Sequence, residues 1–163
     1  MGFLVQKASY VIPETLDSVE SQIQALLDNP WYDFSINLRG ESLHDHVFIL
    51  KTKFTFGLGA AFPFNLVLLE GKLIETGFKQ TTIKTETKLS FPGLVILLVL
   101  IVCVLFNFVN LIMGYRDADW SMGLTFLIMT LAYSFYASFS IKQLKKRFEK
   151  TMNFDSGKAQ NWL

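Results

Sequence analysis

Two long apolar runs dominate the second half of the chain. Residues 94–113 and 122–141 contain no Asp, Glu, Lys or Arg, and eight residues separate them. Twenty helical residues span about 30 Å, the thickness of a bilayer's hydrocarbon core, where only a helix satisfies its own backbone polar groups. A chain of 163 residues could hardly enclose both runs in protein on all sides. The pattern predicts a transmembrane helical hairpin over residues 91–141.

The first third of the chain alternates between strand and helix patterns. Residues 3–12 are rich in β-branched and aromatic types and stop at Pro13, which predicts a strand. A helical spacing of apolar residues follows and predicts a helix that ends near Asn29 and lies with one side on a sheet. The apolar positions of this helix are Leu16, Val19, Ile23, Leu26 and Leu27.

The following residues alternate between apolar and polar positions, which is typical of half-buried strands. Turns are expected at residues 40–42 and 77–80, where glycine and polar residues gather. The alternation predicts four strands, at residues 31–39, 46–56, 66–76 and 81–90.

The order β-α-β-β-β-β predicts an α+β membrane protein with three parts. Residues 1–90 form an antiparallel sheet of about five strands with one covering helix. Residues 91–141 form the transmembrane hairpin, and residues 142–163 form a basic juxtamembrane segment followed by a flexible tail.

Charge predicts the orientation of the hairpin. The net charge of +1 gives no general attraction for nucleic acid, so only clusters of basic residues matter. The segment between the runs carries Arg116, Asp117 and Asp119, whereas the segment after the second run is strongly basic. The positive-inside rule therefore predicts a two-pass cell-membrane protein with both termini in the cytoplasm. The residues expected to set this topology and to meet anionic lipid headgroups are Lys142, Lys145, Lys146, Arg147 and Lys150.

Small and hydrogen-bonding residues predict where the two membrane helices meet, because apolar side chains alone give little drive for association in lipid. An antiparallel turn near residues 117–118 would pair Asn110 with Thr125. It would also place Asn107 opposite residues 128–129, so that its amide reaches a backbone carbonyl or another subunit. The expected helix-contact or partner-facing residues are Cys103, Asn107, Asn110, Thr125, Thr130, Ser134 and Ser138.

The chain offers few candidates for chemistry. His44 and His46 would share one face of a strand and could hold a metal, but the chain has no further histidine, and no partner carboxylates are placed by sequence. Cys103 is the only cysteine, which excludes an intramolecular disulfide. The glycines at 57 and 59 lack the lysine of a phosphate-binding loop. The sequence predicts no catalytic, cofactor or metal site.

One stretch resembles other proteins. Gly71-Lys72-Leu73-Ile74 followed by Thr81-Thr82-Ile83-Lys84, then a proline and an apolar hairpin, is similar to a loosely defined set of bacterial proteins without an established function. Those proteins pair a small antiparallel β domain with two C-terminal membrane helices. Here Gln80 and Leu73 replace the Gly and Ile of the pattern. The resemblance implies the architecture and no activity.

These patterns lead to two hypotheses. The first is a non-enzymatic integral membrane protein, an accessory or assembly subunit that docks onto other subunits of a larger membrane complex. The alternative is a membrane-tethered module for lipid or another apolar ligand, in which the apolar residues 54–64 form a mouth at the bilayer. An enzyme is the third and least supported reading.

Overall fold

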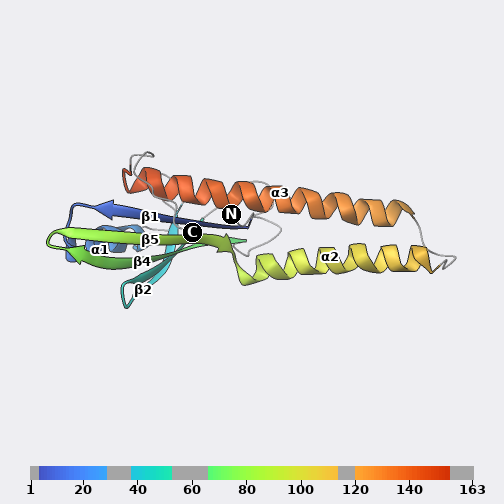
Figure 1. Cartoon of the computed structure of the whole chain (residues 1–163), viewed down its shortest axis with the longest axis horizontal. Helices are drawn as coiled ribbons and strands as arrows, with labels where there is room; N and C mark the ends of the chain where they lie inside the picture. Colours follow the sequence, from blue (N-terminus) through green and yellow to red (C-terminus); the bar gives the residue numbers. More distant parts are fainter. Residues whose placement is uncertain (1–3, 29–37, 53–65, 114–119, 155–163) are drawn as a thin grey trace.

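The chain folds into a sheet domain from which a pair of long helices projects (Figure 1). The computed structural model describes residues 4–28, 38–52, 66–113 and 120–154. The elements are β1 (Val5–Ile12), α1 (Leu16–Leu27), β2 (Arg39–His44), β3 (Val47–Lys51), β4 (Val67–Gly77), β5 (Gln80–Leu89), α2 (Phe91–Ile112) and α3 (Trp120–Thr151).

Among the described residues, five strands form one sheet in the order β1-β5-β4-β3-β2, and every neighbouring pair is antiparallel. This confirms the predicted α+β class and the β-α-β-β-β-β order. The alternation along β5 is also confirmed, because Ile83 and Thr85 are buried whereas Lys84 between them is exposed. One face of the sheet is therefore covered, and the other carries charged residues together with apolar ones such as Val11 and Val47.

Helix α1 covers part of the sheet as its apolar spacing predicts. Val19, Ile23 and Leu26 are buried, and Leu16 and Leu27 are half-buried against the same core. The predicted contact face of this helix is confirmed.

The predicted turn at residues 40–42 is wrong. These residues belong to β2, which carries a bulge between Gly40 and Ser42, and the turn to β3 lies at Asp45 and His46 with φ angles of 49° and 62°. Two positive φ values suit a tight two-residue hairpin turn. Gly40 has a different role, because a Cβ there would overlap the side chain of Leu27 in α1. Of the strands predicted at 31–39 and 46–56, residues 31–37 and 53–56 lie outside the described residues.

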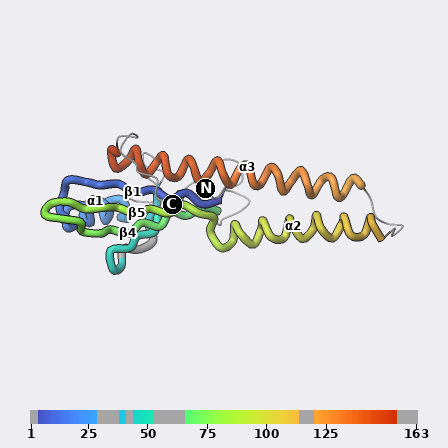
Figure 2. Tube along the Cα trace, viewed as in Figure 1, coloured from blue at the N-terminus to red at the C-terminus, as the bar shows by residue number. Residues whose placement is uncertain are grey.

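The second apolar run is part of a longer helix, α3, which starts at Trp120 and continues to Thr151. The basic segment predicted after residue 141 is therefore helical as far as Thr151 and is continuous with the second apolar run. The end of α3 lies along the sheet (Figure 2), where Ile141, Leu144 and Phe148 are fully buried. These three residues are spaced by three and four positions, the spacing of one helical face. Among the described residues, the sheet is thus covered by two helices, α1 and the end of α3. Of the tail predicted at the end of the chain, residues 155–163 lie outside the described residues.

Candidate functional site: the joint between the sheet and the helix pair

Helices α2 and α3 are long enough and apolar enough to cross a membrane. None of the residues in the most apolar stretch of α2 is buried within the chain, and outward side chains such as Leu98, Phe106 and Leu131 are each more than 60% exposed. The apolar core helix of a soluble protein is instead buried by its neighbours. Exposed apolar surface on this scale is unfavourable in water, so lipid or another protein is expected to cover it.

Strand β5 passes into α2 through a short, hydrogen-bonded corner. The amide of Ser90 donates to the carbonyl oxygen of Leu66 at 2.9 Å, which ties this corner to the start of β4. The Ser90 hydroxyl then accepts from the amide of Gly93 at 3.4 Å and caps the first turn of α2. Pro92 lies in that first turn, where its missing N–H costs nothing. The corner therefore leaves no flexible linker between sheet and helix.

Helix α3 closes the same corner from the other side. The hydroxyl of Tyr133 donates to the carbonyl oxygen of Gly93 at 2.8 Å. A Cβ on Gly93 would lie 2.7 Å from the carbonyl oxygen of Leu66 and 3.3 Å from the Tyr133 hydroxyl. Glycine is thus needed here because three chain segments meet at this point. We call this meeting of β4, β5, α2 and α3 the joint.

We expect Tyr133→Phe to lower the free energy of unfolding of the detergent-solubilised chain by about 1 kcal/mol, because it removes the hydrogen bond to the carbonyl oxygen of Gly93. Chemical denaturation followed by tryptophan fluorescence measures this change. The matched control is Tyr136→Phe, which removes a hydroxyl one turn further along α3. Equal stability of the Tyr133→Phe variant and the parent would contradict the role assigned to this hydrogen bond.

Beyond the joint, aromatic rings hold the end of α3 on the sheet. The Phe148 ring lies edge-on to Tyr10 of β1 at 6.2 Å between centroids and is 5.9 Å from the ring of Phe48 in β3. Phe154, just after α3, stacks on Tyr10 at 4.5 Å. Aromatic pairs in these geometries add to the burial of their surfaces. The contacts join the first strand, a middle strand and the last helix into one unit.

A partly buried polar contact reinforces this unit. The Tyr10 hydroxyl donates to Oε1 of Glu149 at 2.7 Å, and the Lys145 ammonium lies 3.9 Å from the same oxygen. Burial, and then the hydrogen bond to the Glu149 carboxylate, raise the pKa of Tyr10 well above its usual range. The phenol therefore stays protonated in the folded chain at pH values where an unfolded chain would release the proton.

This shift predicts a loss of stability in alkali. The Tyr10 contribution is fully present below about pH 10, the pKa of tyrosine in an unfolded chain, and is lost as the pH rises further. Tyr10→Phe should cost about 1–2 kcal/mol at pH 7, because the bond to a carboxylate is removed, and should flatten the decline above pH 10. Denaturant unfolding at pH 7 and pH 10.5 measures both effects. An unchanged alkaline decline in the variant would show that other groups cause it.

The two long helices meet at a different register from the predicted one. A Cβ on Gly123 would lie 3.7 Å from the Cβ of Asn107, so Asn107 lies beside Gly123 rather than residues 128–129. The predicted pairing of Asn110 with Thr125 is wrong for the same reason. Helix α2 ends at Ile112 and α3 already begins at Trp120, so the centre of the turn lies earlier than the sequence pattern suggested.

The amide of Asn107 is bonded within its own helix. Its Nδ2 donates to the carbonyl oxygen of Cys103 at 2.8 Å, which is one of the two arrangements expected for it. Cys103, Asn107 and Asn110 are all half-buried, whereas Val102, Phe106 and Val109 beside them are exposed. They therefore lie on the less exposed side of α2, the side from which contact with α3 is made.

The predicted contact residues of α3 differ in how exposed they are and in the hydrogen bonds that they form. Thr125 is exposed, and its hydroxyl donates to the Ser121 carbonyl oxygen at 2.7 Å, while the Thr130 hydroxyl donates to Phe126 at 2.8 Å. Such bonds to the preceding turn satisfy hydroxyls inside an apolar helix. Ser134 is half-buried, and Ser138 is buried in the part of α3 that meets the sheet. The stripe of small residues thus runs from the helix pair onto the sheet domain.

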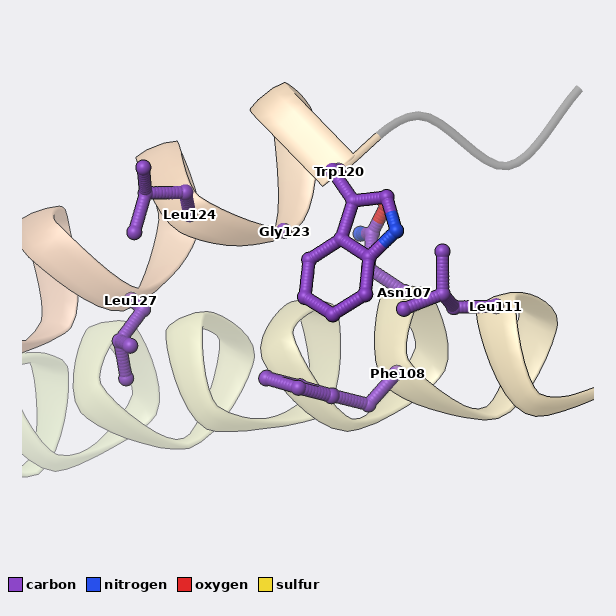
Figure 3. A pocket seen from close by; sticks show the side chains of 7 residues that line it. All are labelled: Asn107, Phe108, Leu111, Trp120, Gly123, Leu124 and Leu127. Atoms are coloured by element: carbon purple, nitrogen blue, oxygen red, sulfur yellow. The ribbon is translucent and has the colours of Figure 1, made fainter.

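A small recess lies between α2 and α3 at the end far from the sheet (Figure 3). Its volume is about 60 Å³, and Trp120 reaches into it from the first turn of α3. Apolar side chains make up most of its wall, and the Nδ2 group of Asn107 is already bonded to Cys103. The lining residues are Asn107, Phe108, Leu111, Trp120, Gly123, Leu124 and Leu127. This recess offers little to select a particular ligand.

The basic residues follow α3 along the sheet instead of forming a belt at one level. A helix rises about 1.5 Å per residue, so Lys150 lies about 12 Å further along the axis than Lys142. Lys142, Lys146 and Lys150 are exposed, whereas Lys145 and Arg147 are half-buried and contact Glu149 and Gln143 respectively. Only the first of these residues lies near the exposed apolar part of the helix, and their contact with lipid headgroups stays a prediction.

The two histidines lie in different parts of the hairpin formed by β2 and β3. His44 ends β2 and His46 lies in the turn, so the expected shared strand face is wrong. His46 Nδ1 contacts the carboxylate of Glu20 in α1, and His44 Nε2 lies 3.6 Å from Asp45. No cluster of three His, Cys, Asp or Glu residues that could bind a metal occurs in the described part of the chain.

These observations define the class of protein: an antiparallel α+β sheet domain joined without a linker to two helices that could cross a membrane. No protein-family model, curated protein or solved structure matches the chain. The resemblance noted in the sequence therefore stays a prediction, and the proposals below depend on the physical features of this molecule.

Proposed function

We propose that the chain is a two-pass integral membrane protein that serves as a non-enzymatic accessory or assembly subunit of a larger membrane complex. One observation carries the proposal: α3 runs without a break from an exposed apolar half to a half that is buried on the sheet. A helix shared by both parts, together with the joint, holds the sheet domain at one height and angle above the bilayer. A rigid connection of this kind suits a protein that presents a surface to neighbouring subunits.

The orientation follows from charge. The end of α3 carries five basic residues along the sheet, which supports a cytoplasmic position for the sheet domain and both termini. Lys142 lies nearest the apolar half and is the residue best placed to meet an anionic headgroup. The remaining basic residues would line the side of the domain.

The alternative, a lipid or apolar-ligand module, has less support. Its expected mouth at residues 54–64 lies outside the described residues. The space between the sheet and its covering helices holds large, fully buried side chains, including Phe48, Leu50, Ile141 and Phe148. A ligand would have to displace these packed residues.

Extraction and native purification test the proposal. Membranes that contain the full chain are washed with alkaline carbonate, then solubilised in mild detergent and separated under native conditions. The chain is expected to resist the wash and to migrate with other membrane proteins in an assembly larger than a monomer. Release by carbonate would contradict membrane insertion, and migration alone as a monomer at every concentration would contradict the role as a subunit.

A further inference from the structure

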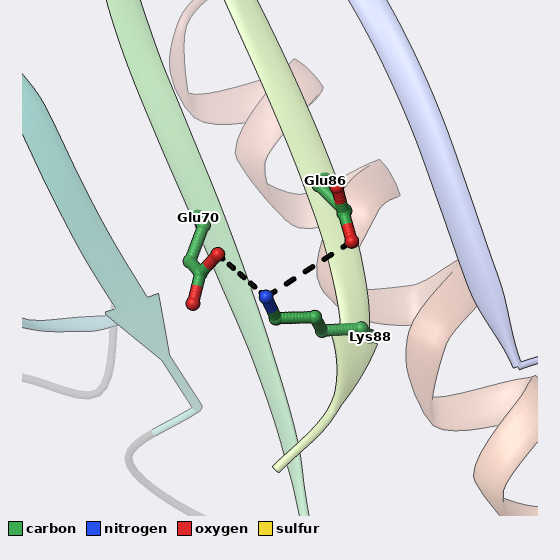
Figure 4. A network of polar contacts seen from close by, with 3 residues as sticks. All are labelled: Glu70, Glu86 and Lys88. Carbon is green, nitrogen blue, oxygen red and sulfur yellow. Dashed lines mark hydrogen bonds and ion pairs between the residues drawn. The ribbon is translucent and has the colours of Figure 1, made fainter. Parts of the chain in front are cut away.

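The sheet carries a row of basic and apolar side chains at its end nearest the helix pair. Strand pairing places five residues directly opposite one another, and directly opposed residues share one face of the sheet. This is the open face, which no helix of the described part covers, and Figure 4 shows Lys88 on it with α3 behind the strands. The five residues, which we call the basal row, are Val5, Lys88, Leu68, Lys51 and Arg39.

The basal row lies where the sheet would meet the bilayer surface. Lys88 precedes Phe91, the first residue of α2, by three positions, which is about 10 Å of extended chain. The 22 residues of α2 extend about 33 Å, so the whole helix is needed to cross a hydrocarbon core of about 30 Å. The core would therefore begin near Phe91, whose side chain is exposed. Lipid headgroups would then occupy the level between Phe91 and the basal row.

A basic residue of α3 lies at a similar level on the other side of the sheet. The Tyr133 hydroxyl contacts the carbonyl oxygen of Gly93, so these two residues mark a common level. From there, Lys142 lies about 14 Å along α3, and Lys88 lies about 12 Å away through one helical turn and two strand residues. The strands and both helices run along the long axis of the molecule (Figure 1). The basal row and Lys142 therefore form a basic belt that α3 alone does not provide.

The charges of the open face are ordered along this axis. The Lys88 ammonium lies 2.6 Å from a carboxylate oxygen of Glu70 and 4.0 Å from one of Glu86 (Figure 4). These two carboxylates are directly opposed in the next row, on the side of the basal row away from the helix pair. Arg39, at the β2 end of the row, is exposed and forms no ion pair with another described residue. A phosphate that approaches from the membrane would therefore meet the Arg39 guanidinium before it meets either carboxylate.

We propose that the basal row binds the phosphate groups of anionic phospholipids in the cytoplasmic leaflet, with Arg39 as the main contact. This inference rests on the proposed function, because it requires the helix pair to be inserted in the bilayer. A guanidinium can donate two parallel hydrogen bonds to one phosphate group. Each basic residue near an anionic leaflet adds to the attraction.

The apolar residues at this level favour a lipid over a soluble phosphate. Val5 and Leu68 are half-buried members of the row, and Phe91 is exposed on its membrane side. These side chains suit the glycerol and acyl parts of a phospholipid, which a soluble phosphate lacks. Together with Lys142, the bound lipid would hold the sheet domain at the bilayer from both sides.

Photolabelling of the full chain in vesicles tests the proposal. The chain is reconstituted into phosphatidylcholine vesicles that contain a trace of an anionic phospholipid with a photoreactive headgroup, and mass spectrometry locates the label. We expect label on the peptides that contain Arg39 or Lys51. Phosphatidylglycerol added to the vesicles in excess should displace it, whereas excess soluble glycerol phosphate should not.

Substitutions separate the basal row from the rest of the open face. Arg39→Gln should lower this labelling about fivefold, the effect of one basic residue at an anionic surface, and Arg39→Lys should retain most of it because the charge is kept. The matched control is Lys72→Gln, which removes an exposed lysine from the same face, four residues further along β4 than Leu68. Lys72 lies about 13 Å further from the bilayer, so its loss should leave the labelling unchanged.

The opposite results overturn the proposal. Label that phosphatidylglycerol fails to displace shows no selection of anionic lipid, and displacement by glycerol phosphate indicates a site for soluble phosphate. A loss from Arg39→Gln no greater than that from Lys72→Gln shows that the basal row is not the site. A chain that resists carbonate extraction but carries no label on these peptides would leave the proposed membrane function in place and remove only this inference.

Discussion

Replacing Phe148 by alanine should destabilise the sheet domain by about 3–5 kcal/mol, the usual cost of removing a fully buried aromatic side chain from a core. Phe148 is the residue through which the end of α3 contacts both Tyr10 and Phe48. The smaller side chain would leave a cavity between the helix and two strands that are far apart in the sequence. We therefore expect the end of α3 to detach before the rest of the sheet unfolds.

Two measurements separate this prediction from a general effect of losing a phenylalanine. Denaturant unfolding gives the change in free energy, and hydrogen exchange of residues 137–151 shows whether α3 detaches locally. The control is Phe135→Ala, on the same helix but 74% exposed, which should change stability by less than about 0.5 kcal/mol. Similar losses from both variants would contradict the packing described for α3.

Gly71→Val should cost about 3 kcal/mol or more. Gly71 lies on the covered face of β4 directly opposite Phe48 of β3, and a Cβ at this position would overlap the Phe48 ring. Phe48 is fully buried and lies in the cluster with Phe148, so it has no space into which to move. Overpacking of a close-packed core typically costs about 1–3 kcal/mol. The cost should be at the upper end or above it here, because valine adds two methyl groups to the Cβ that already overlaps the Phe48 ring.

A double-mutant cycle tests the cause of that cost. Phe48→Leu alone should destabilise the domain, because it removes part of the ring cluster. In the combined Gly71→Val and Phe48→Leu variant, the shorter side chain should make room for valine, so the loss should be smaller than the sum of the single losses by about 1 kcal/mol or more. Additive losses would show that the cost at Gly71 does not come from contact with Phe48.

The local patterns predict the sheet but not the joint. The alternation along β5 from Ile83 onward and the helical spacing in α1 depend only on neighbours in the sequence, and both are confirmed. The turn before β3 was predicted at the wrong place because Gly40 was taken as a turn residue. Its glycine is instead needed for the close contact with Leu27, which exists only when α1 is packed on the sheet. Asp45 and His46 carried the turn signal, since aspartate and histidine tolerate positive φ better than most residues.

The packing of the end of α3 on the sheet was missed for a similar reason. Between residues 142 and 151 five basic residues outnumber two apolar ones, so the segment resembles a topology signal rather than a core helix. Ile141, Leu144 and Phe148 did show helical spacing, and this was the available signal. The partners of this segment gave no signal in the sequence, because they are too distant to form a local pattern. Tyr10 and Glu149, for example, are separated by 139 positions. The predicted register of the helix pair was wrong because it took the ends of the two apolar runs as the ends of the helices, which instead lie at Ile112 and Trp120.

Cysteine accessibility along α3 tests most directly whether the helix pair crosses a bilayer while its continuation lies on the sheet. Leu131→Cys and Lys146→Cys, each in a Cys103→Ala background, are treated with a membrane-impermeant maleimide in sealed right-side-out and inside-out vesicles. Both positions are exposed in the isolated chain, and Leu131 is 63% exposed. We predict no labelling at 131 from either side, because lipid covers it, and rapid labelling at 146 only from the cytoplasmic side. Labelling at 131 as fast as at 146, or labelling at 146 from the outside, would contradict the account.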